Sequence, residues 1–490
     1  MILSKTDYIL FRDCPKNAWY KIHKPEIYRT QELSAFDQSL IETGNEVEVE
    51  ARKLFPGGTL IEQRGKTAID ITQDLLANNT PVIFQATFAT KYYAAVDVLT
   101  KTNTGYVITE IKATNEIKDK THLYDLTFQT ILLRSLGLNV EQVKLLHLNK
   151  DYVRAGELDY TQLFKTEDVT ELVEKLIPEV ELEMQTAYDY LIPEDEPQGP
   201  CDCIYKGRSS HCITFHLSNP HIPEYSVHDI ARIGLSKKKL TELIDSGFYS
   251  LEDIPDEFEL SDIQANQVNT YKTKRPIIDF DNIHKELDGL SYPLYFIDYE
   301  TFPAAIPRFD GFSPYQQIPF QWSLHIVEGP GQKPTHHEFI YTDSLDPSED
   351  FATQMQNVIG EQGSVIVWNK KFECKINDEL ATRLPQFKAF IDNVNSRVYD
   401  LMDIFHKQYY VHPNFKGSTS IKYVLPVMAD ELDYKKLNIQ EGGTASLSWN
   451  KITTGNPTEP EKEQITKDLL TYCELDTFAM YRIWEELHNL

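Results

Sequence analysis

The segment YPLYFIDYETF (292–302) constrains the fold most, because its buried-strand pattern is interrupted by two acidic residues. Residues two apart in a strand share a face, so Asp298 and Glu300 point the same way. An apolar strand seldom carries two such acids without a partner, since each charge is costly to bury. The segment therefore predicts either a strand end or a site at which two carboxylates meet a binding partner.

Three blocks of different composition follow one another along the 490 residues, a length that fits about three domains. Residues 1–190 alternate helical patterns with a β-rich centre, and IPEDEPQGP (192–200) has the composition of an exposed connector. A short helical region precedes a second β/α block that ends in a strongly helical C-terminus. We predict an α/β protein with domains at 1–215 and 286–490 and a helical linker at 216–285.

The overall composition excludes several classes of protein. A hydrophobic content of 41% with 25% charged residues argues against a largely disordered chain. No apolar run approaches the ~20 residues that span a bilayer, and charged groups inside the N-terminal apolar stretch argue against a secretion signal. We therefore expect a cytoplasmic protein without a membrane partner.

The net charge of −27 disfavours broad, non-specific adhesion to nucleic acid. It does not exclude a nuclease, because metal-dependent nucleases concentrate carboxylates at their sites. Six cysteines in a chain of this length are too few for a disulfide framework.

A first candidate site lies in the β-rich centre of the first block. The runs AAVDVL and YVITEIKA flank the turn-like KTNTG and predict a β-hairpin. Asp97 lies on the first run, and Glu110 and Lys112 share a face of the second. Two carboxylates that bind Mg²⁺ or Mn²⁺, with a lysine that orients water, suit phosphodiester hydrolysis. An exposed acid–base pair on a strand surface is the alternative explanation for Glu110 and Lys112.

Two flanking helices favour the catalytic interpretation. YDLTFQTILLRSLG predicts a helix with Asp125 and Gln129 one turn apart, and ETGNEVEVEARKLFPGG predicts an acidic helix that carries Glu48. The order of these parts resembles the RecB-like branch of the PD-(D/E)XK nucleases. The resemblance implies a metal-binding and catalytic core of Asp97, Glu110 and Lys112, with Gln129 on the helix and Glu48 as a further metal ligand, for which Glu46 and Glu50 compete.

The cysteine positions support this resemblance. Cys14 precedes the first block, whereas Cys201, Cys203 and Cys212 follow the connector. One cysteine before the core and three after it resembles the iron–sulfur-stapled RecB-like nucleases. The resemblance implies a [4Fe–4S] cluster on four thiolates; zinc and unliganded thiols are the alternatives, and the C-x-C spacing fits the usual zinc pattern poorly.

A second candidate site joins three motifs of the second block. Asp298 and Glu300 come first, a strand running into a helix brings Glu373, and the C-terminal helix places Tyr472 and Asp476 one turn apart. In this order they resemble the DnaQ-like exonucleases of the RNase H-like superfamily, whose four acids bind two divalent ions. The resemblance implies that the four acids are metal ligands, with Tyr472 as a catalytic residue that orients water. Glu373 departs from the usual aspartate, and an ordinary helix surface pair is the alternative for Tyr472 and Asp476.

Two further segments carry weaker signals. Lys422, with Ser418 and Ser420, has the residue types that contact a phosphate, although a capped surface helix explains them equally well. IARIGLSKKKLTELIDSGFYSLEDIP resembles a helix-hairpin-helix DNA-backbone binder, with an inter-domain spacer as the alternative.

Over its full length the chain resembles a bacterial family catalogued as a domain of unknown function, which fuses an iron–sulfur RecB-like nuclease to a DnaQ-like domain. We therefore predict a Mg²⁺- or Mn²⁺-dependent nuclease with two candidate active sites that acts on DNA, at single-stranded ends. The four acids of the second site are expected in one cleft about 8 Å across, wide enough for two ions. The alternatives are a nucleic-acid-binding module with one or both sites inactive, and a 3′→5′ exoribonuclease that uses only the C-terminal domain.

Overall fold

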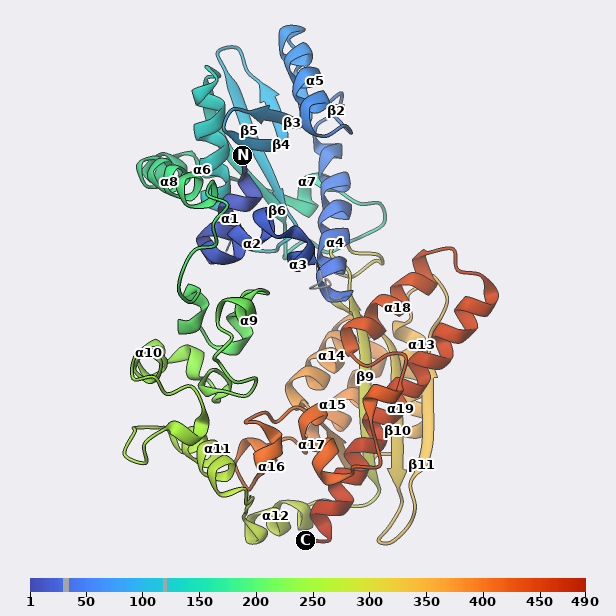
Figure 1. Cartoon of the computed structure of the whole chain (residues 1–490). Helices are drawn as coiled ribbons and strands as arrows, with labels where there is room; N and C mark the ends of the chain where they lie inside the picture. The colour runs from blue at the N-terminus through green and yellow to red at the C-terminus, as the bar shows by residue number, and fades with distance from the viewer. Residues whose placement is uncertain (30–34, 118–120) are drawn as a thin grey trace. The chain divides into compact units, whose positions relative to one another are not determined.

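A computed structural model describes residues 1–29, 35–117 and 121–490 as two compact units, each of mixed α/β structure (Figure 1). The first unit comprises Met1–His221 together with Ala305–Gln316, and the second comprises Ile222–Ala304 together with Gln317–Leu490. Most of the helical segment 216–285, which the sequence suggested as a linker, therefore lies within the second unit. No described helix is both long enough and apolar enough to cross a membrane.

The first unit is built around a seven-stranded sheet. Its strands are β1 (Leu3–Ser4), β2 (Thr59–Leu60), β3 (Val82–Ala89), β4 (Tyr92–Lys101), β5 (Tyr106–Lys112), β6 (Val140–Leu148) and β7 (Phe164–Asp168). Its α-helices are α1 (Lys5–Asp13), α2 (Pro15–His23), α3 (Pro25–Arg29), α4 (Ala35–Ala51), α5 (Gly65–Ala77), α6 (Thr121–Ser135), α7 (Tyr160–Leu163), α8 (Thr170–Leu191) and α9 (Phe215–Ser218).

The strand order in this sheet is β2-β3-β4-β5-β6-β7, with β1 pairing beside β4. The hairpin predicted around KTNTG is present, because β4 and β5 pair antiparallel with Val98 opposite Thr109. The helix predicted after it is also present, and it ends before Gly137, whose φ of 84° is a conformation that glycine adopts without strain. These elements bring the residues of the first candidate site to one side of β4 and β5.

The segment Ala305–Gln316 belongs to the first unit although it interrupts the second unit's sequence. Ala305 and Ile306 are buried in one of its hydrophobic clusters. The Arg154 guanidinium donates to the carbonyl oxygens of Pro307 and Arg308, at 3.0 and 2.6 Å. The Tyr315 hydroxyl donates to the Ala113 carbonyl at 2.7 Å, so backbone and side chains both hold the segment in place.

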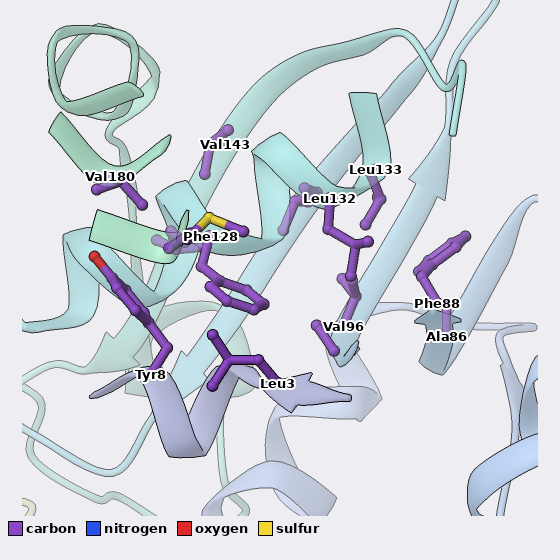
Figure 2. Close-up of a cluster of buried hydrophobic side chains, with 14 of the residues drawn as sticks. Leu3, Tyr8, Ala86, Phe88, Val96, Phe128, Leu132, Leu133, Val143 and Val180 are labelled. Atoms are coloured by element: carbon purple, nitrogen blue, oxygen red, sulfur yellow. The ribbon is translucent and has the colours of Figure 1, made fainter. Parts of the chain in front are cut away.

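The main core of the first unit lies where α6 and α8 pack over the sheet (Figure 2). Phe128, Leu132 and Leu133 of α6 meet Val96 of β4 and Val180 of α8 among the buried residues of this cluster. Burial of apolar surface of this kind contributes roughly 25 cal/mol per Å² to folding. The core thus fixes α6 against β4 and β6, so that Gln129 of α6 reaches Glu110 on β5.

The second unit contains a five-stranded sheet and a short two-stranded one. Its strands are β8 (Ile277–Ile278), β9 (Leu294–Pro303), β10 (Gln317–Val327), β11 (Thr335–Ile340), β12 (Ser364–Val367), β13 (Val398–Asp400) and β14 (Tyr410–Val411). Its α-helices are α10 (Lys237–Asp245), α11 (Asp262–Thr273), α12 (Phe280–Asp288), α13 (Ser348–Val358), α14 (Lys370–Arg383), α15 (Lys388–Ser396), α16 (Asp403–His406), α17 (Ile421–Met428), α18 (Gly442–Thr454) and α19 (Glu459–His488).

The larger sheet has the order β11-β10-β9-β12-β13. β9, β10 and β11 pair antiparallel, whereas β12 runs parallel to both β9 and β13. Helices cover both faces: Tyr295 and Ile297 pack in a cluster with residues of α13, α14 and α15, and Phe296 contacts the rings of Tyr481 and Trp484 on α19. Figure 1 shows α19 lying along β9 and β10. By the alternation of a strand, Asp298 and Glu300 point to the α19 side.

We expect Leu132→Ala to destabilise the protein by about 2–5 kcal/mol, because it removes buried methyl groups and leaves a cavity in the α6 core. Leu132 is 0% exposed, whereas Leu182 on α8 is 71% exposed. Leu182→Ala is therefore the matched control, with an expected change within about 0.5 kcal/mol. Denaturant unfolding of both variants measures the difference, and equal losses would contradict the assigned core.

Candidate functional site

Three carboxylates from two elements form a compact group in the second unit. Asp298 and Glu300 come from β9, and Asp476 comes from α19. One oxygen of each lies within 4.8 Å of the others; Glu300 and Asp476 are buried and Asp298 is partly buried. The two-residue spacing placed Asp298 beside Glu300, and the family resemblance predicted that Asp476 joins them, although 178 positions (476 − 298) separate Asp298 from Asp476.

The electrostatic environment of this group is unfavourable to three negative charges. Burial first, and then repulsion from Asp476 and Glu300, raises the pKa of Asp298 well above its usual range. Burial and the charge of Asp476 do the same to the pKa of Glu300. Burial raises the pKa of Asp476 to about 7, although two tyrosine hydrogen bonds and Lys422 oppose this rise.

Two tyrosine side chains lie beside Asp476. Tyr472 lies one helical turn before it on α19, as predicted, and its hydroxyl lowers the pKa of Asp476. Tyr434 from a short 3₁₀ turn donates to Asp476 Oδ1 at 2.5 Å, and its ring centroid lies 6.1 Å from that of Tyr472. Sequence reasoning missed Tyr434, because no spacing or motif in ELDYKKLNI marks it.

Glu373 lies apart from the compact group but within its electrostatic reach. It is buried in the first turn of α14, and its charge contributes to the raised pKa of Asp298. Burial raises the pKa of Glu373 itself to about 8, with a further contribution from Asp400. Its Oε2 atom is buried without a hydrogen-bond partner among the described residues. An unpaired buried carboxylate oxygen is the kind of atom that a cation would satisfy.

Of the three residues predicted to contact a phosphate, the two serines contact each other locally, and only Lys422 acts on the carboxylate group. The Ser418 hydroxyl accepts a hydrogen bond from the Ser420 backbone N–H at 3.2 Å, which is a local turn contact. Lys422 is exposed on α17, and its positive charge lowers the pKa of both Glu300 and Asp476. The Lys422 ammonium therefore acts electrostatically on both carboxylates.

In the first unit, the structure brings Glu110, Lys112 and Gln129 into direct contact. The Lys112 ammonium donates to Glu110 Oε1 at 2.7 Å, and the Gln129 amide donates to Glu110 Oε2 at 2.7 Å. Lys5 of α1 also donates to Glu110 Oε1, at 2.9 Å. Asp125 accepts from Lys112 at 3.1 Å and from Gln129 at 3.0 Å. Both oxygens of Glu110 are therefore engaged.

Charge balance distinguishes this site from the one in the second unit. Burial by itself would raise the pKa of Glu110, but Lys112 and Lys5 hold it below its usual range. Although burial opposes the charged forms, Glu110 and Asp125 keep the pKa of Lys5 and of Lys112 above the usual lysine value. Sequence reasoning missed Lys5, since nothing in MILSKTDY signals a role in a site a hundred residues away.

The Gln85 side chain joins Glu48 to Asp97, which lies opposite Glu110 in the antiparallel pairing of β4 and β5. Asp97 Oδ2 accepts from the Ile111 backbone N–H at 2.8 Å, and burial, followed by the charge of Glu110, raises the pKa of Asp97 to about 7. The Gln85 amide lies 2.6 Å from Glu48 Oε1 and 3.3 Å from Asp97 Oδ1. Of the three acidic candidates on α4, Glu48 is thus the one linked to Asp97, while it also pairs with Arg52.

The four predicted cysteines converge in the first unit. The sulfur atoms of Cys14, Cys201, Cys203 and Cys212 lie within 4.8 Å of one another, and all four side chains are buried. The sulfurs of Cys201 and Cys212 are 3.9 Å apart, and the Asn219 amide donates to Cys201 Sγ at 3.2 Å. Four buried thiols with one supporting donor are a ligand set that could hold a metal ion.

One family model and one known protein each match part of the chain. Residues 295–420 match a family model described as a domain of unknown function (DUF2779), a range that includes Asp298, Glu300 and Glu373. A protein of Ureaplasma parvum serovar 3, described as uncharacterized, is 29% identical over 212 residues. That match covers 39% of this chain and 31% of the relative, so the chain matches less than a third of the relative's length.

We expect Cys14→Ser to abolish metal binding at the cysteine group, because Cys14 supplies one of four ligands and links the N-terminal helices to residues 201–212. Cys374→Ser is the matched control, since Cys374 lies outside the group. Elemental and sulfide analysis of anaerobically purified protein measures metal per chain. An unchanged metal content in Cys14→Ser would rule out a four-thiolate centre.

Proposed function

We propose that this protein is a Mg²⁺- or Mn²⁺-dependent nuclease that hydrolyses phosphodiester bonds of DNA, with its principal active site in the second unit. The observation that carries the proposal is the group of Asp298, Glu300 and Asp476, whose oxygens lie within 4.8 Å of one another. Oxygen ligands of this kind suit hard divalent cations. The buried Oε2 of Glu373, which has no hydrogen-bond partner among the described residues, supports a fourth ligand outside the compact group.

The topology of the second unit supports an RNase H-like, DnaQ-type domain. Three antiparallel strands followed by two parallel ones, in the order β11-β10-β9-β12-β13, agree with that expectation. The acids also lie on the elements that the family resemblance requires: the first strand β9, the helix after β12 and the last helix. For the first unit, the sheet with Asp97 and Glu110 on β4 and β5 supports a PD-(D/E)XK domain.

Bound divalent ions would supply a water nucleophile and a Lewis acid for the phosphate. The protein's own groups would prepare that chemistry. Tyr434 and Tyr472 orient the Asp476 carboxylate through their hydroxyls. The Lys422 ammonium offers a positive charge beside the acids, where it would attract the backbone phosphate of a nucleic acid.

The first unit supports a second, weaker candidate site. A metal ion at Glu110 would have to displace at least one of its contacts, because Lys5, Lys112 and Gln129 occupy both oxygens. This engagement favours the alternative in which the first unit binds nucleic acid without cleaving it. The second unit, in which no lysine is paired with the three acids among the described ion pairs, then performs the hydrolysis.

A metal centre bound by the cysteine group would link the N-terminal helices of the first unit to residues 201–212. Two sulfur atoms bound to one tetrahedral ion, with metal–sulfur bonds of ~2.3 Å, are ~3.8 Å apart. This is close to the 3.9 Å between the sulfur atoms of Cys201 and Cys212. In a [4Fe–4S] cluster each thiolate binds a different iron, so the sulfurs spread farther. The spacing therefore favours a single ion, zinc or iron, over the cluster that the family resemblance implies.

Asp298→Asn should lower DNA cleavage by roughly 100-fold or more, because a lost metal ligand removes several kcal/mol of charge stabilisation. Asp281→Asn, an exposed acid on α12, should cleave like the parent. End-labelled single- and double-stranded DNA, with RNA in parallel and Mn²⁺ present, measures both variants. Full activity of Asp298→Asn would refute the proposal, and cleavage of RNA alone would replace DNA by RNA as the substrate.

Lys112→Ala tests the first unit in the same assay. If the first site cleaves, residual activity of Asp298→Asn should disappear when Lys112→Ala is added, because the ammonium acts on developing charge. If the double variant and Asp298→Asn retain the same residual activity, the first unit does not contribute to hydrolysis.

Glu373→Gln should lose most activity and Glu373→Asp should retain it, because a ligand needs a charged oxygen more than it needs length. Both variants keep a polar side chain in the first turn of α14, so they form a matched pair. Steady-state cleavage with varied Mn²⁺ measures them. Equal activity of Glu373→Gln and the parent would show that the site works with the three grouped acids alone.

A further inference from the structure

Two histidines and a glutamate converge on the α19 face of the second unit's sheet. His325 on β10 lies opposite His336 on β11 in the antiparallel register, so their side chains share a face. Glu474 comes from α19, which packs on β10 and β11. One ligand atom of each of these three residues lies within 4.8 Å of the others.

Hydroxyl groups orient both imidazole rings. Thr477 Oγ1 lies 2.8 Å from His325 Nδ1, and Ser323 Oγ lies 3.0 Å from His336 Nε2. The two hydroxyls are 2.8 Å apart, and Thr477 also donates to the Glu474 carbonyl at 3.1 Å. These four bonds are all satisfied when each ring donates its N–H to a hydroxyl, Ser323 donates to Thr477, and Thr477 donates to the carbonyl.

This arrangement leaves a lone pair on His325 Nε2 and another on His336 Nδ1. The two rings stack, with centroids 4.6 Å apart and planes 25° apart, so one ring must turn before both lone pairs can meet one ion. Neither nitrogen has a hydrogen-bond partner within the part of the chain that the structure describes. Metal-binding histidines are typically held in this way, with the second ring nitrogen donating to a protein oxygen.

The distance between His336 and Glu474 suits a shared ion better than a hydrogen bond. His336 Nδ1 lies 3.7 Å from Glu474 Oε1, beyond the 2.7–3.2 Å or so of a normal hydrogen bond. Two ligands of one tetrahedral zinc ion, at ~2.0–2.2 Å from it, stand ~3.3–3.5 Å apart. The Glu474 side chain is 51% exposed, so it is free to make the small shift required.

We propose that His325, His336 and Glu474 form a binding site for a zinc-class transition-metal ion, separate from the carboxylate group of the proposed nuclease site. Two imidazoles and one carboxylate suit zinc, whereas Mg²⁺ prefers oxygen ligands alone. The ion would join the edge strand β11 to α19, the helix that carries Tyr472 and Asp476. The inference does not depend on the proposed nuclease activity.

Titration calorimetry with Zn²⁺ tests this site on the full chain, in excess Mg²⁺ so that Mg²⁺ competes for the carboxylate group. The variants are His336→Gln and Glu474→Gln, and His337→Gln is the control because His337 is exposed and alternates to the opposite face of β11. Zinc that the cysteine group holds is common to all four proteins and cancels in the comparison.

The parent and His337→Gln should bind one more Zn²⁺ per chain than His336→Gln and Glu474→Gln, or bind that ion at least ~100-fold more tightly. The loss of a residue that only supports a metal ligand already lowers metal affinity by roughly 10–100-fold. Zn²⁺ should also raise the unfolding temperature of the parent more than that of Glu474→Gln, whose half-exposed side chain can be replaced without unfolding the protein. Equal zinc stoichiometry and affinity in all four proteins would overturn the proposal.

Discussion

The burial of three carboxylates in one group is the constraint on which the second unit depends. Asp298 and Glu300 interrupt an otherwise hydrophobic strand at the centre of the sheet, and Asp476 comes from the helix that covers that face. Burial and mutual repulsion raise the pKa of Asp298 and Glu300. The hydroxyls of Tyr434 and Tyr472 compensate only part of this cost, because a neutral donor cannot cancel a charge. In the function proposed above, a divalent cation compensates the remainder.

In the first unit, the ammonium groups of lysine residues compensate the buried carboxylates. Glu110 lies between the ammonium groups of Lys5 and Lys112, and Asp125 accepts from both lysine and glutamine partners. Removing one member of such a buried set is strongly destabilising, since it leaves an uncompensated charge. The two units therefore differ in how their buried carboxylates are compensated: lysines pair with those of the first unit, whereas no described ion pair joins a lysine to the three grouped acids of the second.

The sequence predicted the parts of each site that come from local periodicity. Two-residue spacing placed Asp298 beside Glu300, and the general α/β class was also correct. The convergence of the four cysteines was correct as well, but it was predicted from the family resemblance and not from periodicity. Tyr434 and Lys5 were missed, because each reaches its site from an element whose own sequence has no chemical signature. The inclusion of residues 305–316 in the first unit was missed as well, since it depends on long-range packing that no local pattern encodes.

Anomalous diffraction from crystals grown with saturating Mn²⁺ tests the central claim most directly, because it locates the ion without relying on activity. The account predicts a manganese peak bound by Asp298, Glu300 and Asp476, with Glu373 turned toward it or toward a second peak within about 4 Å. Fully ordered carboxylates without manganese between them would contradict the account. The acid group would then be a buried, proton-sharing cluster, and the proposed nuclease would have no principal active site.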